Sequence, residues 1–276
     1  MLLKKDDISK YVKSYFGTSS SIYDVNEDDL FWARELLKGG YILHFRHAER
    51  DKWIDVQMYD ALESDLTQEY ENEVRYAEND YFGTGPTILA VYAKKILDKY
   101  SLKNILELGC GQGRDSIYFA KLGYSIVALD LSENAIKFIE KTRNDENLKN
   151  LQLITHDIQK PLNFQNSKFD MVYSNLSLQF FDLSQLSKIF SNIADIMLPD
   201  SFFLFSTKKA GDKYYNFGNK ISDSAFESKG VTRFFFTKSE LESLLEIFFT
   251  IISFEEDKHV NLDNTVSVWW KILVKK

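Results

Sequence analysis

The stretch NILELGCGQGRDSIYFAKLG, residues 104–123, places an apolar run, a glycine-rich turn and an amphipathic segment in direct succession. The run NILEL predicts a buried β-strand, and the segment after the turn predicts a helix that Gly123 ends. Glycine has no Cβ, so the backbone of such a turn can come close to a ligand. The amides at the start of the helix then face that ligand. The stretch therefore predicts a strand–turn–helix unit around a small-molecule site.

The segments that follow alternate between apolar strands and helices. The further strands are expected at 124–130, 151–157, 169–175, 201–208 and two late positions near FTIISFEE and VSVWWKILV. The helices are expected at 87–100, from Ser132, over 183–198 and from Thr237. Near-continuous apolar strands that alternate with helices indicate a parallel sheet covered on both faces. We therefore predict an α/β, Rossmann-like doubly wound fold, with a mostly parallel seven-stranded sheet and an antiparallel edge strand.

Composition excludes several classes of protein. The chain has one cysteine, Cys110, so an intramolecular disulfide and a thiolate metal cluster are both excluded, and four scattered histidines predict no metal site. No apolar run is long enough for a signal peptide or a membrane span, which predicts a cytoplasmic protein without a membrane partner. The sequence also leaves room for a homodimer.

Charge is distributed unevenly along the chain. Residues 1–80 carry 10 Lys and Arg against 18 Asp and Glu, whereas residues 81–276 carry 24 against 23. Neither segment has the basic excess that a phosphate backbone requires, so a nucleic-acid partner is not expected. We predict two domains, an acidic, α-rich N-terminal extension over 1–80, with a helix over 26–40 and a strand over 41–45, and an α/β domain over 81–276.

Two acidic residues accompany the glycine turn. Glu107 lies two residues before Gly109, and Asp130 ends the next strand, where a carboxylate can accept both hydroxyls of a ribose. A dinucleotide site favours G-x-G-x-x-G, but Arg114 stands at the third glycine position after Gly109 and Gly111. A carboxylate at Glu107 would also repel a pyrophosphate, whereas it could lie near a cationic amino-acid group. This chemistry favours a sulfonium nucleoside over a nicotinamide dinucleotide.

The segment ILELGCGQGRDSIYFAKLGYSIVALDLSENAI resembles the class I S-adenosylmethionine-dependent methyltransferases, from their first motif to the acidic end of the second strand. The resemblance covers residues 81–276 and continues through THDI (155–158), FDMVYSNLSLQFF (169–181), SFFLFSTK (201–208) and RFFFTKSELESLL (233–245). Within that family the chain is most similar to small-molecule enzymes of the tellurite-resistance group. The resemblance implies S-adenosylmethionine as cofactor and S-adenosylhomocysteine as product.

The resemblance assigns cofactor roles position by position. Gly109, Cys110 and Gly111 would pass under the methionine part, with Glu107 near its amino group. Asp130 would bind the ribose hydroxyls. The remaining assignments are Leu131 and Ile158 on the adenine, Asp157 at its amine, Asn175 beside the methyl group, Tyr81 and Phe82 as a lid, and Arg114 as a further candidate.

The catalytic and substrate residues are less constrained, because methyl transfer needs alignment more than acid–base chemistry. No catalytic residue is assigned, and Asn175 and Gln179 are the candidates near the methyl group. Relatives often carry a histidine where Gln179 stands, so an obvious base is missing. Tyr214, Tyr215 and Arg233 are the expected substrate wall, although aromatic residues there equally suit packing.

The stretch GGYILHFRHAER (39–50) is similar to the start of the histidine phosphatase family, whose R-H motif Arg46 and His47 match. The similarity runs from about residue 30 to residue 80. It leaves out the later arginine, histidine and acid of that family's phosphate pocket. We therefore expect a cap rather than a phosphatase, in which His47 could still touch a substrate.

Together these features predict an enzyme that transfers a methyl group from S-adenosylmethionine to a small-molecule acceptor by direct displacement. Two alternatives remain open at this point. One is a protein that binds S-adenosylmethionine without turnover and recruits a partner through its acidic extension. The other is a nicotinamide-dependent oxidoreductase, which the missing third glycine disfavours.

Overall fold

The computed structural model describes residues 43–47, 52–56, 85–162, 164, 169–228, 230–260 and 266–276. The chain divides into two compact units, Met1–Asp65 and Leu66–Lys276. In the first unit, β1 (Leu43–His47) and β2 (Lys52–Val56) pair antiparallel, and β1 overlaps the strand expected over 41–45. The helix expected over 26–40 and the domain boundary expected at residue 80 lie outside the described residues.

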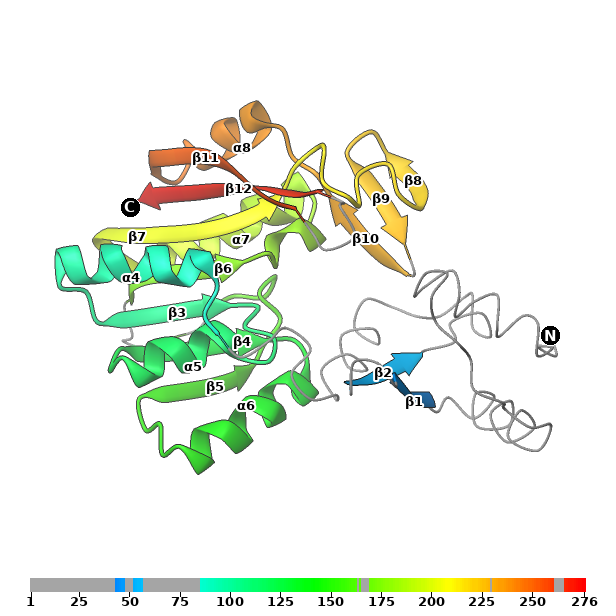
Figure 1. Cartoon of the computed structure of the whole chain (residues 1–276). Coiled ribbons are helices and arrows are strands. Elements are labelled where there is room, and N and C mark those ends of the chain that lie inside the picture. Colours follow the sequence, from blue (N-terminus) through cyan, green and yellow to red (C-terminus); the bar gives the residue numbers. More distant parts are fainter. Residues whose placement is uncertain are drawn as a thin grey trace. The chain divides into compact units, whose positions relative to one another are not determined.

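The second unit is built on a seven-stranded sheet in the order β11-β12-β7-β6-β3-β4-β5 (Figure 1). Its strands are β3 (Asn104–Leu108), β4 (Ser125–Asp130), β5 (Leu151–Thr155), β6 (Phe169–Asn175), β7 (Met197–Lys208), β11 (Thr250–Val260) and β12 (Val266–Lys275). The five strands from β7 to β5 pair in parallel, and β12 runs antiparallel to both β7 and β11. The mostly parallel sheet with antiparallel pairing at one edge confirms the predicted fold class.

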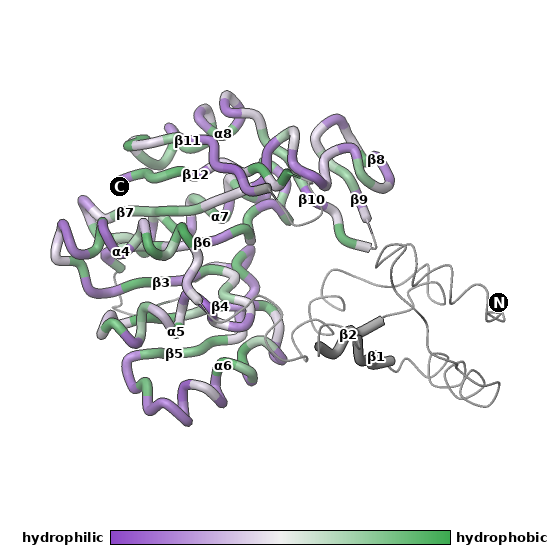
Figure 2. Tube along the Cα trace, in the orientation of Figure 1, coloured by the Kyte–Doolittle hydropathy of each residue, from purple (hydrophilic) through white to green (hydrophobic). Residues whose placement is uncertain are grey.

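Helices cover both faces of the sheet, and each face has its own apolar core. The helices are α4 (Ile88–Tyr100), α5 (Arg114–Lys121), α6 (Glu133–Asp145), α7 (Leu183–Ile196) and α8 (Lys238–Leu245). The core of α4, α5 and α6 takes Ile105, Tyr173 and Leu204 from the strands, and that of α7 and α8 takes Leu106 and Phe203. Successive strand residues thus serve opposite faces, which is why these strands read as continuous apolar runs. Figure 2 shows long hydrophobic stretches within the strands of this sheet, for example in β7.

The helix starts follow from capping residues. Each of the helices α4, α6, α7 and α8 begins after a capping side chain that accepts a hydrogen bond from the backbone amide three residues later. These capping residues are Thr87, Ser132, Asp182 and Thr237. Asp182 and Thr237 form complete capping boxes with Gln185 and Glu240. The helix expected over 183–198 is shorter than predicted, because β7 already begins at Met197.

The polar segment 209–230 and the four residues after it form strands that the sequence does not indicate. β8 (Asn219–Ser222), β9 (Ala225–Ser228) and β10 (Val231–Phe234) form a separate antiparallel sheet in the order β10-β9-β8. Figure 1 shows these three strands beyond the carboxyl end of β7. All four residues of β8 are exposed, so no apolar alternation marks the strand in the sequence.

The two directions of the sheet meet at β3. From β3 the chain moves outward through β4 to β5, and then returns to place β6 on the other side of β3. Such a reversal opens a crevice at the carboxyl ends of the strands, where α/β proteins bind ligands. The glycine turn after β3, Asp130 at the end of β4 and Asn175 at the end of β6 all belong to this carboxyl edge.

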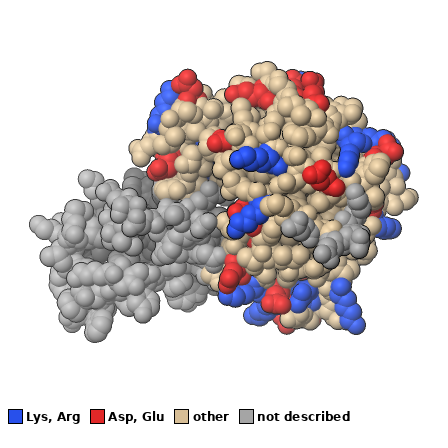
Figure 3. Space-filling view, turned by 180° about the vertical axis from the view of Figure 1, so that it is seen from behind, with Lys and Arg blue, Asp and Glu red and all other residues tan. Residues whose placement is uncertain are grey.

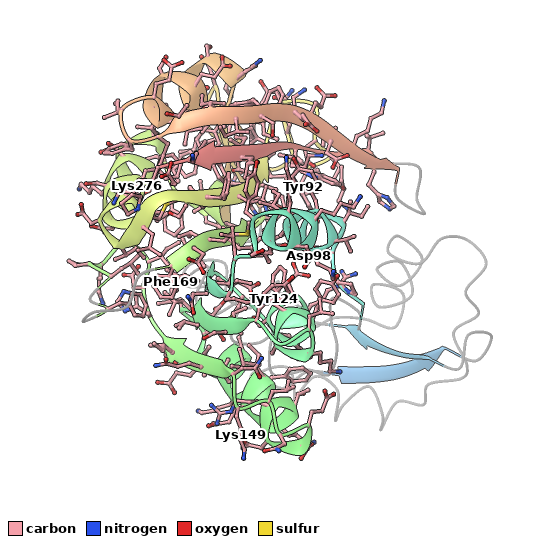
Figure 4. All side chains as sticks on the ribbon, turned by 90° about the vertical axis from the view of Figure 1, so that its left-hand side faces the viewer. Tyr92, Asp98, Tyr124, Lys149, Phe169 and Lys276 are labelled. Atoms are coloured by element: carbon pink, nitrogen blue, oxygen red, sulfur yellow. The ribbon has the colours of Figure 1, made fainter. Side chains whose placement is uncertain are left out.

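At the opposite edge of the sheet, where the strands begin, Tyr124 at the amino end of β4 donates a hydrogen bond of 2.6 Å to Asp98 of α4 (Figure 4).

On the face in Figure 3, basic and acidic side chains are interspersed among the described residues, without a broad basic field. None of the described helices combines the length and apolar character that crossing a membrane requires.

The aromatic cluster under α7 provides a test of the packing. The ring of Phe190 lies 5.8 Å from Phe203, 5.7 Å from Phe205 and 6.2 Å from Phe249. Truncating Phe190→Ala leaves a cavity among these rings and should lower the free energy of unfolding by about 3–5 kcal/mol. Ile247→Ala, at a side chain that is 68% exposed, should change it by less than about 0.5 kcal/mol. Chemical denaturation measures both, and equal effects would contradict this packing.

Candidate functional site

The glycine turn leaves β3 at Leu108 and enters α5 at Arg114. Gly109, Gly111 and Gly113 all have positive φ, at 69°, 52° and 75°, a backbone region that glycine adopts without the strain of a side chain. The amide of Cys110 donates to the carbonyl oxygen of Leu129 at 2.9 Å, which ties the turn to β4. The expected turn is therefore present, at the reversal point of the sheet.

Two of these glycines also make room for neighbouring elements. A Cβ on Gly109 would lie 2.4 Å from the Cβ of Ser177, and one on Gly113 would lie 2.6 Å from Ile139. Ser177 belongs to the loop after β6, and its Oγ donates to the carbonyl oxygen of Leu108 at 3.1 Å. The small size of Gly109 thus lets the loop after β6 close against the turn, a contact that the sequence does not reveal.

Asp130 connects the turn to the next loop. Its Oδ2 accepts a hydrogen bond of 2.7 Å from the amide of Gly111, and its Oδ1 accepts one of 2.9 Å from the amide of Ser132. The residue is buried at 7% exposure. A carboxylate oxygen has more than one lone pair and can accept more than one hydrogen bond. Asp130 therefore holds the turn in shape, and its contact with a ribose stays a prediction.

Glu107 lies under the turn on the α5 side of β3. Its Oε2 accepts a hydrogen bond of 2.5 Å from the Ser116 hydroxyl, and the residue is 3% exposed. Burial raises the pKa of the Glu107 carboxyl well above its ordinary value, and the charges of Asp115 and Asp130 add to this, against the effect of the Ser116 bond. The site therefore gathers three carboxyl groups, whose charged forms a bound cation would stabilise.

This gathering of carboxyl groups is the test of whether a sulfonium amino-acid cofactor fits. S-adenosylmethionine carries positive charge on its sulfur and its amino group, and a ribose with two hydroxyls. Glu107 and Asp130 offer the acceptors that these groups need, beside a turn with space for close backbone approach. Burial also raises the pKa of the Cys110 thiol, so Cys110 stays protonated and acts as a packing residue. The residues present fit the cofactor.

A second set of hydrogen bonds joins the start of α4 to α5 and β6. Asp115 accepts from the amide and hydroxyl of Thr87, at 2.8 and 2.7 Å, and from the hydroxyl of Tyr173 at 2.6 Å. Arg114 donates to the carbonyl oxygens of Gly85 and Pro86. In this structure Arg114 thus holds the chain that enters α4. Neither Asp115 nor Thr87 was among the expected site residues. Asp115 is 28 residues from Thr87 and 58 residues from Tyr173 in the sequence, so no local pattern indicates these bonds.

The expected adenine residues lie after β4 and β5. Asp157 is half-buried, and its Oδ1 accepts from the amide of Gln159 at 2.9 Å, which shapes the loop after β5. Ile158 is buried in the core under α7, while the Leu131 side chain is 45% exposed. The structure brings all three to the carboxyl edge beside Asp130. Their contacts with an adenine ring stay predictions.

The expected methyl-group residues share the loop after β6. Asn175 ends β6, and its Oδ1 accepts a hydrogen bond of 2.7 Å from the Ser206 hydroxyl. Gln179 lies in a short 3₁₀ turn, Leu178–Phe180, and is 4% exposed. Its Nε2 donates to the carbonyl oxygen of Leu176. Both candidate residues therefore carry amides, which orient ligands but do not take up protons at neutral pH.

The expected substrate wall contains buried charge. The guanidinium of Arg233 lies 4.7 Å from the ring centre of Tyr214 and 6.0 Å from that of Phe180. Tyr215 packs instead against Phe226 and Phe235, with ring centres 5.1 and 5.4 Å away. The structure thus brings Tyr214 and Arg233 together beside the loop after β6, and gives Tyr215 a place in the packing of the small sheet.

One buried ion pair was missed by the sequence reasoning. Lys208 Nζ lies 2.6 Å from Asp212 Oδ2, with side chains 9% and 0% exposed. Burial lowers the pKa of Lys208. The negative charge of Asp212 raises this pKa, whereas the positive charges of Lys213 and Arg233 lower it further. A lysine that ends a buried strand was the available signal, since such a residue is seldom buried without a partner.

Three expected residues fall where the structure gives no side-chain account. Tyr81 and Phe82 lie outside the described residues, so the lid stays a prediction. His47 is the last residue of β1 in the other unit. Its role toward a substrate also stays a prediction.

Comparison with known proteins adds a family and a fold. The family model of the tellurite resistance protein TehB matches residues 75–218, which is more than half of the chain. The probable S-adenosyl-L-methionine-dependent methyltransferase TehB of Haemophilus influenzae is 32% identical over 123 residues, covering 43% of this chain and 41% of that protein. Phosphoethanolamine N-methyltransferase 1 of Triticum aestivum is 27% identical over 157 residues, covering 56% and 28%. The chain thus spans less than half the length of these curated relatives.

Among solved structures, that of TehB from Haemophilus influenzae superposes with a TM-score of 0.55 at 23% identity. The alignment covers 74% of this chain and 67% of that chain. At this level of identity the likeness establishes the fold, which agrees with the sheet order and the helix layers described above.

The contact between Gly109 and Ser177 predicts a difference between two glycine substitutions. Gly109→Ala should lower the free energy of unfolding by about 2–4 kcal/mol, because left-handed strain and overpacking add. Gly123→Ala is the matched control, since Gly123 has φ 85° and nothing within 4 Å of an added Cβ. It should cost only the strain, about 1–2 kcal/mol. Equal losses in chemical denaturation would show that Ser177 does not press on the turn.

The raised pKa of Glu107 predicts a pH-dependent stability. Above the ordinary carboxyl value of 4.5, the unfolded chain loses its proton while the folded chain keeps it. Stability therefore falls as pH rises from that value to the higher folded pKa. Glu107→Gln removes this loss, so without cofactor the variant should melt above wild type at pH 8, with a smaller difference at pH 4. A variant less stable than wild type at pH 8 would contradict the assignment.

Proposed function

The chain belongs to the family of the tellurite resistance protein TehB, and from this we propose that it is an S-adenosylmethionine-dependent methyltransferase. The methyl group goes to a small-molecule acceptor by direct displacement, and S-adenosylhomocysteine is the product. The observation that carries the proposal is the pair of buried carboxyl groups, Glu107 and Asp130, on either side of a glycine turn at the carboxyl edge of the sheet.

Each part of the site has a function in this proposal. Glu107 faces the amino-acid part of the cofactor, and the amides of the turn from Gly109 to Gly113 approach it closely. Asp130 accepts from the ribose hydroxyls while its bonds to Gly111 and Ser132 hold it in place. Asp157 lies at the adenine end, beyond β5. When bound, the cofactor supplies a methyl group on a sulfonium, which is the reactive centre.

The protein's own contribution is alignment and exclusion of water. The loop after β6 is held by Ser206, which bonds Asn175, and by Ser177, which bonds the end of β3. A loop held by these bonds can place an acceptor in line with the methyl group, and such alignment provides much of the catalysis of a bimolecular displacement. The amides of Asn175 and Gln179 suit orientation rather than proton removal.

The geometry disfavours the nicotinamide alternative. A pyrophosphate at this turn would lie beside the charges of Asp115 and Asp130, which already raise the pKa of the buried Glu107. Arg114, at the position of the third glycine, contacts the carbonyl oxygens of Gly85 and Pro86. Relatives named for different acceptors, an amine in one case and a carrier-bound malonyl group in another, leave the acceptor to be found by experiment.

The proposal is tested by calorimetry with S-adenosylhomocysteine and by methyl transfer from labelled S-adenosylmethionine. We expect S-adenosylhomocysteine to bind and NADH not to bind. Asp130→Asn should lower the affinity for S-adenosylhomocysteine at least about tenfold, because a charged carboxylate with two acceptor oxygens becomes a neutral amide with one acceptor and one donor. Asp170→Asn, at the other end of the sheet, is the control and should bind as wild type.

The possible outcomes separate the three readings. Binding of S-adenosylhomocysteine, together with its formation from S-adenosylmethionine in the presence of an acceptor, supports the proposal that the protein is an enzyme. Binding without turnover against a broad acceptor panel would identify a non-catalytic binding protein. Binding of NADH in place of S-adenosylhomocysteine would contradict the proposal.

A further inference from the structure

Gln179 has one half of its amide satisfied and the other half without a partner. Its Nε2 donates to the carbonyl oxygen of Leu176, whereas its Oε1 is buried and has no hydrogen-bond partner. The bond to Leu176 fixes the orientation of the amide, because a flipped amide would set two carbonyl oxygens against each other. Buried carbonyl groups are nearly always paired in proteins. The Oε1 of Gln179 is therefore an acceptor that a donor from a ligand can pair.

This acceptor atom lies in the loop that lines the proposed methyl-transfer site. The amide of Leu176 donates to Ser206 Oγ at 3.0 Å, and Ser206 in turn donates to Asn175. Ser177, two residues before Gln179, presses against Gly109 of the turn. Gln179 thus belongs to a loop that contacts both the glycine turn and β7, at the reversal point where a ligand is expected.

A carbonyl oxygen at this place restricts the nucleophile. It can accept a hydrogen bond from an N–H or O–H group, but it does not take up a proton at neutral pH. A hydroxyl or thiol must lose its proton to attack a methyl group, which calls for a base. An uncharged amine attacks with its lone pair and keeps its N–H bonds during the transfer. Gln179 therefore matches an amine.

The histidines of this unit do not replace a base at Gln179. His156 follows β5. Two strands, β3 and β4, lie between β5 and β6, so β5 is roughly 14 Å from β6, the strand that leads to Gln179. His259 is in β11, separated from β6 by β12 and β7, at a similar spacing of roughly 14 Å or more.

The neighbouring charges indicate a second group on the acceptor. Arg233 lies over the ring of Phe180, the residue after Gln179, and Lys208 is two residues after Ser206. Around Lys208, Asp212 supplies negative charge, while Lys213 and Arg233 add positive charge. The field at this end of β7 therefore suits a carboxylate or phosphate on the ligand. It also disfavours the protonated form of a nearby amine, and so keeps the amine nucleophilic.

We propose that the methyl acceptor is a small primary or secondary amine that carries a carboxylate or phosphate. This rests on the proposed function. Gln179 Oε1 accepts a hydrogen bond from the amine N–H, and the cations Lys208 and Arg233 face the anionic group. In the transfer, the lone pair of the nitrogen forms a bond to the methyl carbon while the carbon–sulfur bond breaks. The electron pair of the broken bond stays on sulfur. The methylated ammonium then releases one proton to solvent.

The full chain is first assayed for transfer of labelled methyl from S-adenosylmethionine. The probes are β-alanine and 2-aminoethyl phosphate, their hydroxyl analogues 3-hydroxypropanoate and 2-hydroxyethyl phosphate, the uncharged propylamine, and inorganic selenite, within a wider set of small amines, alcohols and thiols. We expect the acceptors to be amines with an anionic group, the two named anions distinguishing carboxylate from phosphate. Acceptors that are alcohols, thiols, inorganic oxyanions or uncharged amines would overturn the proposal.

Binding of S-adenosylhomocysteine is measured on the same preparation. If it binds and no anionic amine of the set is methylated, the acceptor proposal fails while the cofactor site stands. If it does not bind, the proposed function itself fails. The two failures are therefore distinct.

Variants then test the two halves of the recognition with the best anionic amine found. Gln179→Leu should lower kcat/KM at least tenfold, with unchanged affinity for S-adenosylhomocysteine and an unchanged or higher melting temperature, because an unpaired carbonyl is removed. Arg233→Gln should raise KM with little change in kcat. Gln152→Leu, at an exposed residue of β5, is the matched control and should keep wild-type kinetics. A Gln179→Leu variant with wild-type kinetics, or one that loses activity only by melting lower, would overturn the role of Gln179.

Discussion

The hydrogen bonds of Asp130 are the constraint on which the rest of the site depends. One carboxylate, buried at the end of β4, accepts from the amide of Gly111 in the glycine turn and from the amide of Ser132, the residue that caps α6. It thereby fixes the turn relative to two strands and one helix. Because an acid at this position also suits a ribose, the residue that shapes the turn is the same residue proposed to bind the ligand.

Charge is arranged in two parts along the carboxyl edge. The side of the turn holds the buried carboxyl groups of Glu107, Asp115 and Asp130, whereas the end of β7 holds the cations Lys208 and Arg233. Burial of charge is costly unless it is paired. Lys208 is paired with Asp212. In the proposed function, the positive charge of the cofactor adds to the stabilisation of the acidic part, and an anionic acceptor adds to that of the basic part. The loop after β6, which contains Asn175 and Gln179, lies between them.

Much of the fold could be predicted from the sequence, because apolar runs and capping residues are local signals. The strand from 104 to 108, its glycine turn and the helix started by Ser132 all lie where they were expected. The sheet β8-β9-β10 was missed, since its strands have four residues each and β8 is fully exposed. Contacts made across the fold were also missed. Asp115 binds Tyr173 at a separation of 58 residues, and the unpaired oxygen of Gln179 is a property of the packed structure alone.

The most direct test of the account is a crystal structure of the full chain with S-adenosylhomocysteine. We predict that the ribose hydroxyls lie within hydrogen-bond distance of the Asp130 carboxylate and that the amino group lies toward Glu107. Asn175 and Gln179 should then border the space next to the sulfur. A complex in which the ligand occupies another part of the chain, or in which Asp130 keeps its bonds to Gly111 and Ser132 and does not touch the ribose, would contradict the account.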